Sequence, residues 1–328
     1  HRKDQKNKKA PILEIINLEK HFPIKSGLFN RITGQVYAVD GVTLELHQGE
    51  TLGLVGESGC GKSTVARTIV QLIKPTGGSV KVNGIDLATV SSKELKEIRQ
   101  KIQIIFQDPF SSLDPRMKAK DIVGELLSVH QNLSASELDE TVAHLFSQVG
   151  LVKDQMDNYP HEFSGGQRQR LGIARALSLN PEIIICDEPV SALDVSIQAQ
   201  IINLLLNLQE NLGISLIFVS HDLAVVRHIS HRVAVMYLGR IVEAAGKEAL
   251  FSHPLHPYTQ SLLEAVPVAS PNKRRAKNIL EGDVPSPINR PTGCHFHERC
   301  PKATGKCKET SPTLTENSTG HLVACHNI

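Results

Sequence analysis

A glycine-rich run between an apolar segment and a predicted helix is the part of this sequence best suited to chemistry. Residues 56–63 read GESGCGKS, and they follow the strand-like TLGLV of residues 51–55. The glycines let successive backbone N–H groups turn toward a phosphate at a helix N-terminus, where the helix dipole also favours an anion. Lys62 can reach the β- and γ-phosphates, and the Ser63 hydroxyl can bind Mg²⁺. The sequence therefore predicts a P-loop that binds a nucleoside triphosphate.

An apolar strand that ends in an acidic pair predicts a second part of the same site. Residues 183–188 read IIICDE. In a P-loop protein the first acid, Asp187, is expected to contact Mg²⁺. The second acid, Glu188, is placed to polarise a water molecule aimed at the γ-phosphate. An acidic pair at a strand end is common in isolation, but beside a P-loop it indicates phosphate chemistry.

A second glycine-rich helix start lies at residues 163–170, which read FSGGQRQR. A serine and two glycines at the beginning of a helix make a second possible anion site. Each bound nucleotide needs only one such loop from a given chain. The pair of loops is therefore explained if each nucleotide lies between the P-loop of one subunit and this loop of another.

Composition and charge exclude several classes of protein. The chain has 328 residues, and its formal net charge of +2 says nothing about nucleic acid or membrane lipid. Aromatic residues are few and Trp is absent, so no base-stacking platform stands out and no nucleic-acid partner is expected. No apolar run approaches the roughly 20 residues of a membrane-spanning helix. Residues 1–10 are basic without the apolar core of a signal peptide, and we expect a disordered tail there. The chain is expected in the cytosol unless a partner holds it at a membrane.

Strand-like and helix-like segments alternate along the chain, which favours an α/β fold with a parallel, doubly wound sheet. Runs that predict strands lie at 12–16, 38–46, 79–82, 102–107, 182–187 and 214–219. Residues 195–212 predict an amphipathic helix, and the helical pattern of 119–178 indicates an insertion. Prolines then interrupt the sequence. We expect residues 256–328 to form an irregular extension, distant from the P-loop, that needs a metal site for order.

Four of the six cysteines lie in this extension, namely Cys294, Cys300, Cys307 and Cys325. Thiols of a cytosolic protein stay reduced, so the cluster indicates a metal or iron–sulfur site rather than disulfides. The spacing Cys-x5-Cys-x6-Cys-x17-Cys lacks the closer pairs usual in zinc sites. Four thiolates suit either an iron–sulfur cluster or a structural zinc, and the sequence leaves both open. Four histidines of the tail could replace a cysteine as ligand, although we expect their side chains to be solvated: His295, His297, His321 and His326.

Taken together and in this order, the motifs resemble those of ABC-transporter ATPase subunits, over residues 11–265. Residues 163–167 resemble the ABC signature, Gln107 the Q-loop glutamine, and residues 191–194 (SALD) the D-loop. His221 falls at the position of the switch histidine, and Phe22, with Tyr37 as second choice, at that of the aromatic residue that stacks on adenine. The resemblance implies an ATPase with a P-loop NTPase fold over 11–255, a helical subdomain over about 110–178, and an extension over 256–328.

The resemblance also assigns roles to individual residues. Catalysis is expected from Glu188, His221 and Gln107, and Mg²⁺ binding from Ser63, Gln107 and Asp187. ATP is expected at Phe22 or Tyr37 and at Gly56, Ser58, Gly59, Cys60, Gly61, Lys62, Ser63 and Thr64. The ATP of a partner subunit is expected at Ser164, Gly165, Gly166 and Gln167, with Asp194 at the dimer interface.

Further segments narrow the resemblance to oligopeptide and dipeptide importers. They are residues 107–116 (QDPFSSLDPR), residues 256–263 (HPYTQSLL) and the cysteine-rich tail. The N-terminal segment resembles the second, F-type ATPase subunit of these importers. The resemblance implies a [4Fe–4S] cluster, with Zn²⁺ as the alternative. It also implies four partners, which are a second ATPase subunit, two membrane permeases and, indirectly, an extracytoplasmic peptide-binding protein. The site of action would be the cytoplasmic face of the membrane. A nickel importer and a soluble ABC ATPase without membrane partners are the alternatives.

Overall fold

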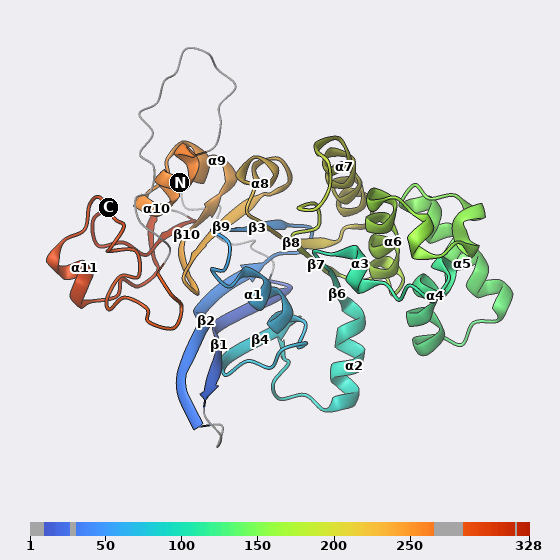
Figure 1. Ribbon diagram of the computed structural model, residues 1–328, viewed down its shortest axis with the longest axis horizontal. Coiled ribbons are helices and arrows are strands. Elements are labelled where there is room, and N and C mark those ends of the chain that lie inside the picture. Colours follow the sequence, from blue (N-terminus) through green and yellow to red (C-terminus); the bar gives the residue numbers. More distant parts are fainter. Residues whose placement is uncertain (1–9, 27–30, 266–284, 319) are drawn as a thin grey trace, which may run out of the picture. The chain divides into compact units, whose positions relative to one another are not determined.

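The computed structural model describes residues 10–26, 31–265, 285–318 and 320–328 (Figure 1). Residues 1–9, and with them nearly all of the expected basic tail, lie outside this description. The chain forms two compact units. Unit 1 contains His47–Glu50 and Thr89–Val219, and unit 2 contains Pro11–Leu46, Thr51–Ala88 and Ser220–Ile328. The P-loop and the C-terminal extension thus belong to the same unit.

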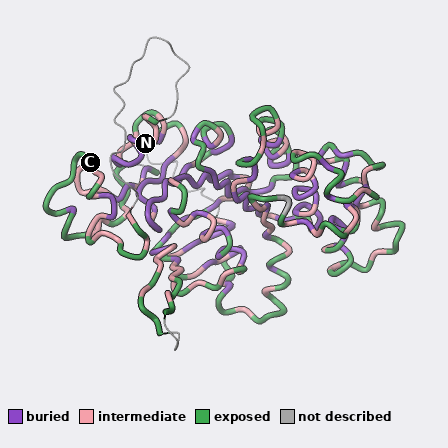
Figure 2. Tube along the Cα trace, in the orientation of Figure 1, coloured by how far each residue is buried: buried purple, intermediate pink, exposed green. Residues whose placement is uncertain are grey.

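Unit 1 is built on three parallel strands in the order β8 (Ser215–Ser220), β7 (Ile183–Asp187) and β6 (Ile102–Ile105). β7 and β8 are buried along their whole length, as Figure 2 shows, which explains why their sequences are nearly continuous apolar runs. α7 (Val195–Leu212) connects them and has the bounds that the amphipathic pattern predicts. α2 (Ser92–Lys101) precedes β6.

The helical part of unit 1 confirms the predicted insertion. It consists of α3 (Pro109–Ser112), α4 (Ala119–His130), α5 (Ala135–Gln148), the 3₁₀ turns η1 (Lys153–Asp157) and η2 (Pro160–Glu162), and α6 (Gly165–Leu177). α4, α5 and α6 bury apolar side chains such as Val123, Phe146 and Leu171. Gly150, with φ at +75°, ends the turn after α5.

Unit 2 contains an antiparallel sheet in the order β2-β1-β4-β5. Its strands are β1 (Leu13–Ser26), β2 (Arg31–Leu46), β4 (Gly77–Val82) and the short β5 (Ile85–Asp86). The second half of β2 alternates between buried and exposed residues, as expected for a sheet with one covered face. The expected parallel, doubly wound sheet therefore does not extend to this part of the chain, whose strands pair in antiparallel fashion.

The remaining strands of unit 2 follow the order β3-β9-β10-β12-β11. β3 (Thr51–Val55) runs parallel to β9 (Arg232–Tyr237), whereas β10 (Arg240–Gly246), β12 (His321–Val323) and β11 (Thr315–Ser318) pair in antiparallel fashion. α8 (Leu223–Ile229) packs closely on β3, because a Cβ at Gly53 would lie 2.5 Å from the Val226 side chain. α1 (Lys62–Ile69) follows the P-loop, and α9 (Lys247–Ser252) follows β10.

The C-terminal extension is more regular than the sequence suggests. It contains α10 (Pro257–Glu264), α11 (Gly305–Glu309) and the strands β11 and β12. β12 pairs with β10 through Leu322 and Val323, so the end of the chain adds strands to the sheet of unit 2. The expectation of a wholly irregular extension is therefore wrong. Leu322 and Val323 are enough for β12 because β10 offers it an edge to pair with, and the polar strand β11 then pairs with β12.

Candidate functional site

The P-loop joins the buried strand β3 to α1 in the geometry that its sequence predicts. Gly61 precedes α1 with φ at +107°, and no side chain in the described part of the chain caps this helix. A Cβ at Gly61 would lie 2.0 Å from the carbonyl oxygen of Ala38, so only glycine fits there. The first N–H groups of α1 therefore lie at a helix N-terminus that is suited to an anion.

Lys62 lies inside the loop rather than in solvent. Its side chain is 4% exposed, and Nζ donates hydrogen bonds to the carbonyl oxygens of Gly56 (2.8 Å) and Glu57 (3.0 Å). Cys60 is also buried, and burial raises the pKa of its thiol. These contacts hold one positive charge over the concave side of the loop, where a phosphate needs it.

The two aromatic residues proposed for adenine differ in their surroundings. Arg290 lies 3.8 Å from the ring centroid of Tyr37, and the ring of His21 meets Tyr37 edge-on at 4.6 Å. Phe22 is 36% exposed, with Lys20 Nζ 5.0 Å from its ring centroid. The ring of Phe22 is therefore the better placed of the two to stack on a base.

In unit 1 the structure brings together two of the residues expected to hydrolyse ATP. Gln107 Nε2 donates a hydrogen bond of 3.1 Å to Glu188 Oε2. Glu188 is half-buried at the end of β7, directly after the fully buried Asp187. The Q-loop residue can thus hold the carboxylate that the sequence assigns to water activation.

The backbone of Glu188 has an unusual conformation. Its φ of +47° lies in the left-handed region, which costs a residue with a side chain about 1–3 kcal/mol. Its N–H donates to Val219 O at 3.1 Å, and its carbonyl accepts hydrogen bonds from Ser191 Oγ (3.1 Å) and N (3.3 Å). Strain of this kind is typical of functional sites. Ser191, the first residue of the predicted D-loop, therefore helps to fix the backbone of Glu188.

The predicted signature loop forms the start of α6. Ser164 Oγ accepts a hydrogen bond from the Gln167 N–H (3.3 Å), and Gln167 Oε1 accepts one from the Ser164 N–H (2.9 Å). This reciprocal pair is a capping box. A Cβ at Gly166 would lie 2.5 Å from Ile197 Cγ2, and one at Gly165 would lie 3.4 Å from Leu193 Cδ2, so α6 begins against the D-loop and α7.

Two further predicted site residues, Asp194 and His221, lie next to helix starts. Asp194 is exposed and precedes α7 as its N-cap residue. His221 is exposed and belongs to unit 2, directly before Asp222, whose carboxylate caps α8 by accepting N–H groups of Ala224 and Val225. Both residues are accessible for contacts with a nucleotide or a partner.

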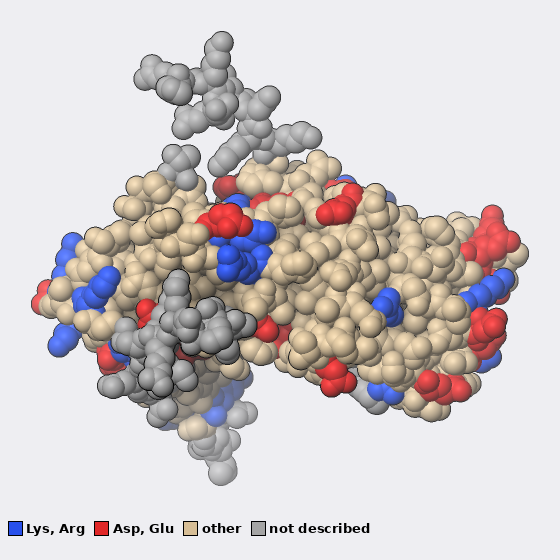
Figure 3. All heavy atoms as spheres, turned by 90° about the horizontal axis from the view of Figure 1, so that it is seen from above, with Lys and Arg blue, Asp and Glu red and all other residues tan. Residues whose placement is uncertain are grey.

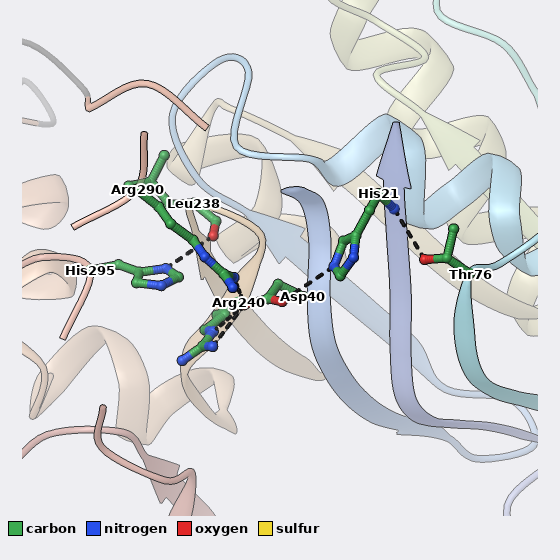
Figure 4. A network of polar contacts seen from close by, with 7 residues as sticks. All are labelled: His21, Asp40, Thr76, Leu238, Arg240, Arg290 and His295. Carbon is green, nitrogen blue, oxygen red and sulfur yellow. Dashed lines mark hydrogen bonds and ion pairs between the residues drawn. The ribbon is translucent and has the colours of Figure 1, made fainter. Parts of the chain in front are cut away.

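A polar network that the sequence did not reveal ties the extension to the antiparallel sheet (Figure 4). Asp40 is 8% exposed and pairs with Arg240 (2.7 Å) and Arg290, while His21 Nε2 lies 3.3 Å from its other oxygen. Burial would raise the pKa of Asp40, but the hydrogen bond and charge of Arg240, with the charge of Arg290, outweigh burial and lower it. One signal was available, because Asp40 is a polar residue that interrupts the alternation of β2.

The extension also contacts the P-loop directly. Arg299 forms an ion pair with Glu57, whose N–H donates to the Tyr258 hydroxyl. The expectation that the extension lies far from the P-loop is therefore wrong. No local pattern announces this pairing, since Glu57 and Arg299 are 242 residues apart.

The four tail cysteines lie close enough together for their charges to interact. Burial raises the pKa of Cys294, Cys300 and Cys325, and the charges of neighbouring cysteines add to the increase. Burial acts in the same direction on Cys307, but hydrogen bonds from Thr304 and Asn327 outweigh it and lower the Cys307 pKa. Backbone N–H groups two residues downstream of Cys294, Cys300 and Cys325 donate to their sulfur atoms. Such donors stabilise thiolates, which are the form that binds metal.

Among the described residues, no group of three or more His, Cys, Asp or Glu side chains is placed to hold a metal ion. A tetrahedral zinc site would need sulfur atoms roughly 3.8 Å apart, from Zn–S bonds of about 2.3 Å. Two of the tail histidines are not solvated as expected, because His295 and His321 are only 7% and 5% exposed. His321 donates to the buried Glu243 carboxylate at 2.7 Å and so has a structural partner.

Across residues 10–26, 31–265, 285–318 and 320–328, every helix is too short or too polar to cross a bilayer. On the face drawn in Figure 3, basic side chains lie in small groups beside acidic ones. Surfaces of this kind create no strong field of one sign.

Comparison with known families gives two matches along the chain. A model of the ABC transporter family matches residues 39–191, which include the P-loop, Gln107, Glu188 and the signature loop. A model described as the oligopeptide/dipeptide transporter C-terminal region matches residues 242–307.

Curated relatives match nearly the whole chain. The oligopeptide transport ATP-binding protein AppF of Bacillus subtilis is 54% identical over 318 residues, which cover 96% of this chain and 97% of AppF. OppF of Salmonella typhimurium, an oligopeptide transport ATP-binding protein, is 54% identical and covers 97% of this chain and 96% of its own. The dipeptide transport ATP-binding protein DppF of Haemophilus influenzae is 50% identical, with 97% of each chain covered.

Solved structures agree with the fold. A dimeric ATP-binding cassette in a post-hydrolysis state, bound to ADP and Pi, superposes with a TM-score of 0.64 at 32% identity. The match covers 72% of this chain and 98% of that one.

Proposed function

We propose that this chain hydrolyses ATP to power peptide import, because it belongs to the ABC transporter family and, within it, to the oligopeptide and dipeptide transport ATP-binding proteins. The observation that carries the hydrolytic part is the hydrogen bond between Gln107 and Glu188. The names of AppF, OppF and DppF support oligopeptides or dipeptides as the solute.

In the proposed reaction, different residues bind the phosphates, the adenine, the attacking water and Mg²⁺. Lys62 neutralises phosphate charge, and Phe22 stacks on adenine because the Tyr37 ring is already covered. Glu188 orients the attacking water, with Gln107 fixing its carboxylate. Ser63, Gln107 and Asp187 offer hydroxyl, amide and carboxylate oxygens, a donor set that suits Mg²⁺. Bound Mg²⁺ would neutralise charge on the transferred phosphate.

The second anion loop implies a partner. A complete P-loop and an exposed capped loop at Ser164–Gln167 in one chain are explained if each loop serves a different nucleotide of a dimer. We propose that the other subunit is a second ATPase, that the pair docks on two permeases at the cytoplasmic face of the membrane, and that a peptide-binding protein delivers the solute. The exposed D-loop residue Asp194 would then lie at the dimer interface.

Replacement of Glu188 by Gln tests the hydrolytic role. Glu188→Gln keeps the hydrogen bond to Gln107 but removes the base, so ATP turnover of the reconstituted transporter should fall at least about a hundredfold while ATP binding persists. Glu210→Gln, on the exposed face of α7, is the matched control and should be silent. Turnover by Glu188→Gln near that of wild type would contradict the proposal.

We further propose that Cys294, Cys300, Cys307 and Cys325 bind a [4Fe–4S] cluster that orders the extension. Two observations support this, namely the electrostatic coupling of the thiols and the N–H groups directed at their sulfur atoms.

Anaerobic purification tests the cluster. The protein should be brown and contain iron and sulfide in near-stoichiometric amounts, and Cys300→Ser should lose both. His297→Ala and His326→Ala, at the alternative ligands, should retain them. Colourless protein with one bound zinc per chain would replace the cluster by zinc, and four reactive thiols in an ordered extension would exclude both.

A further inference from the structure

The second residue of the P-loop is held by the C-terminal extension. Arg299 Nη1 and Nη2 donate to the two carboxylate oxygens of Glu57 at 2.8 and 3.0 Å, in a bidentate pair. The Arg299 side chain is 6% exposed and that of Glu57 is 24% exposed. An arginine guanidinium keeps its charge at any physiological pH, so the pair with Glu57 is an ion pair.

The backbone of the same residue is held as well. The Glu57 N–H donates to the Tyr258 hydroxyl at 2.9 Å, and Tyr258 is fully buried. Its ring packs against Tyr237 at 4.6 Å and against Phe296 of the extension at 5.3 Å between centroids. The carbonyl oxygen of Glu57 accepts from Lys62 Nζ at 3.0 Å. Glu57 therefore links residues 258 and 299 to the lysine that faces the phosphates.

We propose that Arg299 and Tyr258 are positioning residues for the P-loop of their own chain, with Arg299 neutralising a loop carboxylate that would otherwise repel ATP. The proposal rests on the proposed function, because the ligand of the loop is taken to be ATP. A carboxylate within the phosphate-binding loop is an unfavourable neighbour for a polyanion. A bidentate guanidinium removes this repulsion and fixes the loop at the same time.

The position of Arg299 in the sequence connects its ion pair with Glu57 to the tail cysteines. Arg299 directly precedes Cys300, and its N–H donates to Phe296 O at 3.0 Å in a turn that begins at Cys294. Whatever orders Cys294 and Cys300 also orders this turn and thus the guanidinium. The extension acts on nucleotide affinity through Arg299 together with Tyr258.

ATP binding by the full chain, measured by calorimetry with Mg²⁺ present, tests the proposal through charge. Arg299→Ala leaves Glu57 uncompensated and should raise the Kd for ATP about tenfold or more. Glu57→Gln removes the repelling charge and should leave the Kd unchanged or lower it. The double variant carries neither charge and should recover most of the affinity lost in Arg299→Ala. Arg299→Lys should lie between wild type and Arg299→Ala.

The same variants separate affinity from chemistry. In the assembled transporter, Arg299→Ala should raise the KM for ATP while kcat stays within about twofold, because the residue does not touch the reacting atoms. Lys308→Ala, at an exposed position of α11, is the control and should change neither value. An unchanged Kd in Arg299→Ala would overturn the proposal, and so would failure of Glu57→Gln to restore affinity.

Two further comparisons cover an Arg299→Ala variant that does not fold and a wild-type chain that does not bind ATP. If Arg299→Ala does not fold, a Kd for Arg299→Lys equal to that of wild type overturns the role of the bidentate pair. If the wild-type chain itself fails to bind ATP, the proposed function falls and this inference with it. If wild type binds ATP, Lys62→Ala does not, and the Arg299 variants bind normally, only this inference falls.

Discussion

The two glycine-rich loops of this chain begin helices in opposite ways. The P-loop leads into α1 through Gly61, without a side-chain cap within the described residues, and its lysine is folded over the loop. The signature loop leads into α6 through a complete capping box, in which Ser164 and Gln167 satisfy each other's N–H groups. One helix start is open to an anion, and the other is already closed by its own side chains.

This difference indicates a division of labour. An uncapped helix start with a buried lysine can bind phosphate within a single chain. A capped start gains little from an anion by itself, and it becomes useful when a partner presents a nucleotide that is already bound. The P-loop should therefore determine nucleotide affinity, and the signature loop should affect turnover in the assembled complex.

The largest effect that follows from this comparison concerns Lys62. Lys62→Ala removes a charge-assisted contact to the phosphates and should weaken ATP binding by the isolated chain about tenfold to a hundredfold. Ser164→Ala should leave that binding within about twofold of wild type but lower turnover in the complex. Equilibrium titration with ATP measures the first effect, and the ATPase rate of the reconstituted transporter measures the second. Equal losses of ATP affinity in the two variants would show that the loops are not specialised.

The sequence predicts these two loops well because their constraints are local. Gly61 has a positive φ beside a carbonyl, Lys62 follows it, and the Ser164–Gln167 box lies within four consecutive residues. The helix bounds of α7 and the buried runs of β7 and β8 were predictable for the same reason. What supports the P-loop was not, because Arg299 and Tyr258 reach Glu57 from more than 200 residues away.

The next effect separates the loops by pH. His256 caps α10 by accepting the Tyr258 N–H, and burial lowers its pKa to about 4. The unfolded chain, with a His pKa of about 6.5, takes up the proton first, so stability is complete above pH 6.5 and falls toward pH 4. At pH 5 the lowered pKa of His256 therefore costs about 2 kcal/mol of the free energy of unfolding, compared with pH above 6.5. The box of Ser164 and Gln167 does not titrate.

Denaturant unfolding of wild type and His256→Asn at pH 7.5 and pH 5.0 measures this effect. Asn keeps an N-cap acceptor but cannot be protonated, so its stability should depend less on pH by about that amount. Hydrogen exchange should locate the loss in α10, next to the P-loop support, and not at the start of α6. The same pH dependence in both proteins would assign acid sensitivity to other groups.

The extension shows most clearly why some features escape sequence reasoning. Prolines and cysteines suggested an irregular segment, yet Leu322 and Val323 complete a sheet whose edge lies at β10. His321 looked like a solvated tail residue, but it pairs with Glu243, a charge buried in that same strand. Each error concerns a residue whose partner lies far away in sequence. Local patterns carry no information about such partners.

The smallest effect in stability distinguishes a cap that only stabilises from one that must admit an anion. α5 begins with a box of the same geometry, in which Glu137 replaces glutamine and accepts the Ser134 N–H at 2.8 Å. A carboxylate at this position suits the helix dipole but would repel a phosphate, whereas Gln167 closes the box without charge. Gln167→Glu should therefore change stability by no more than about 0.5 kcal/mol while lowering turnover in the complex severalfold. Glu137→Gln, the reverse exchange in α5, should leave turnover unchanged. Thermal unfolding and the ATPase rate of both variants decide the matter, and full activity of Gln167→Glu would mean that no phosphate approaches this loop.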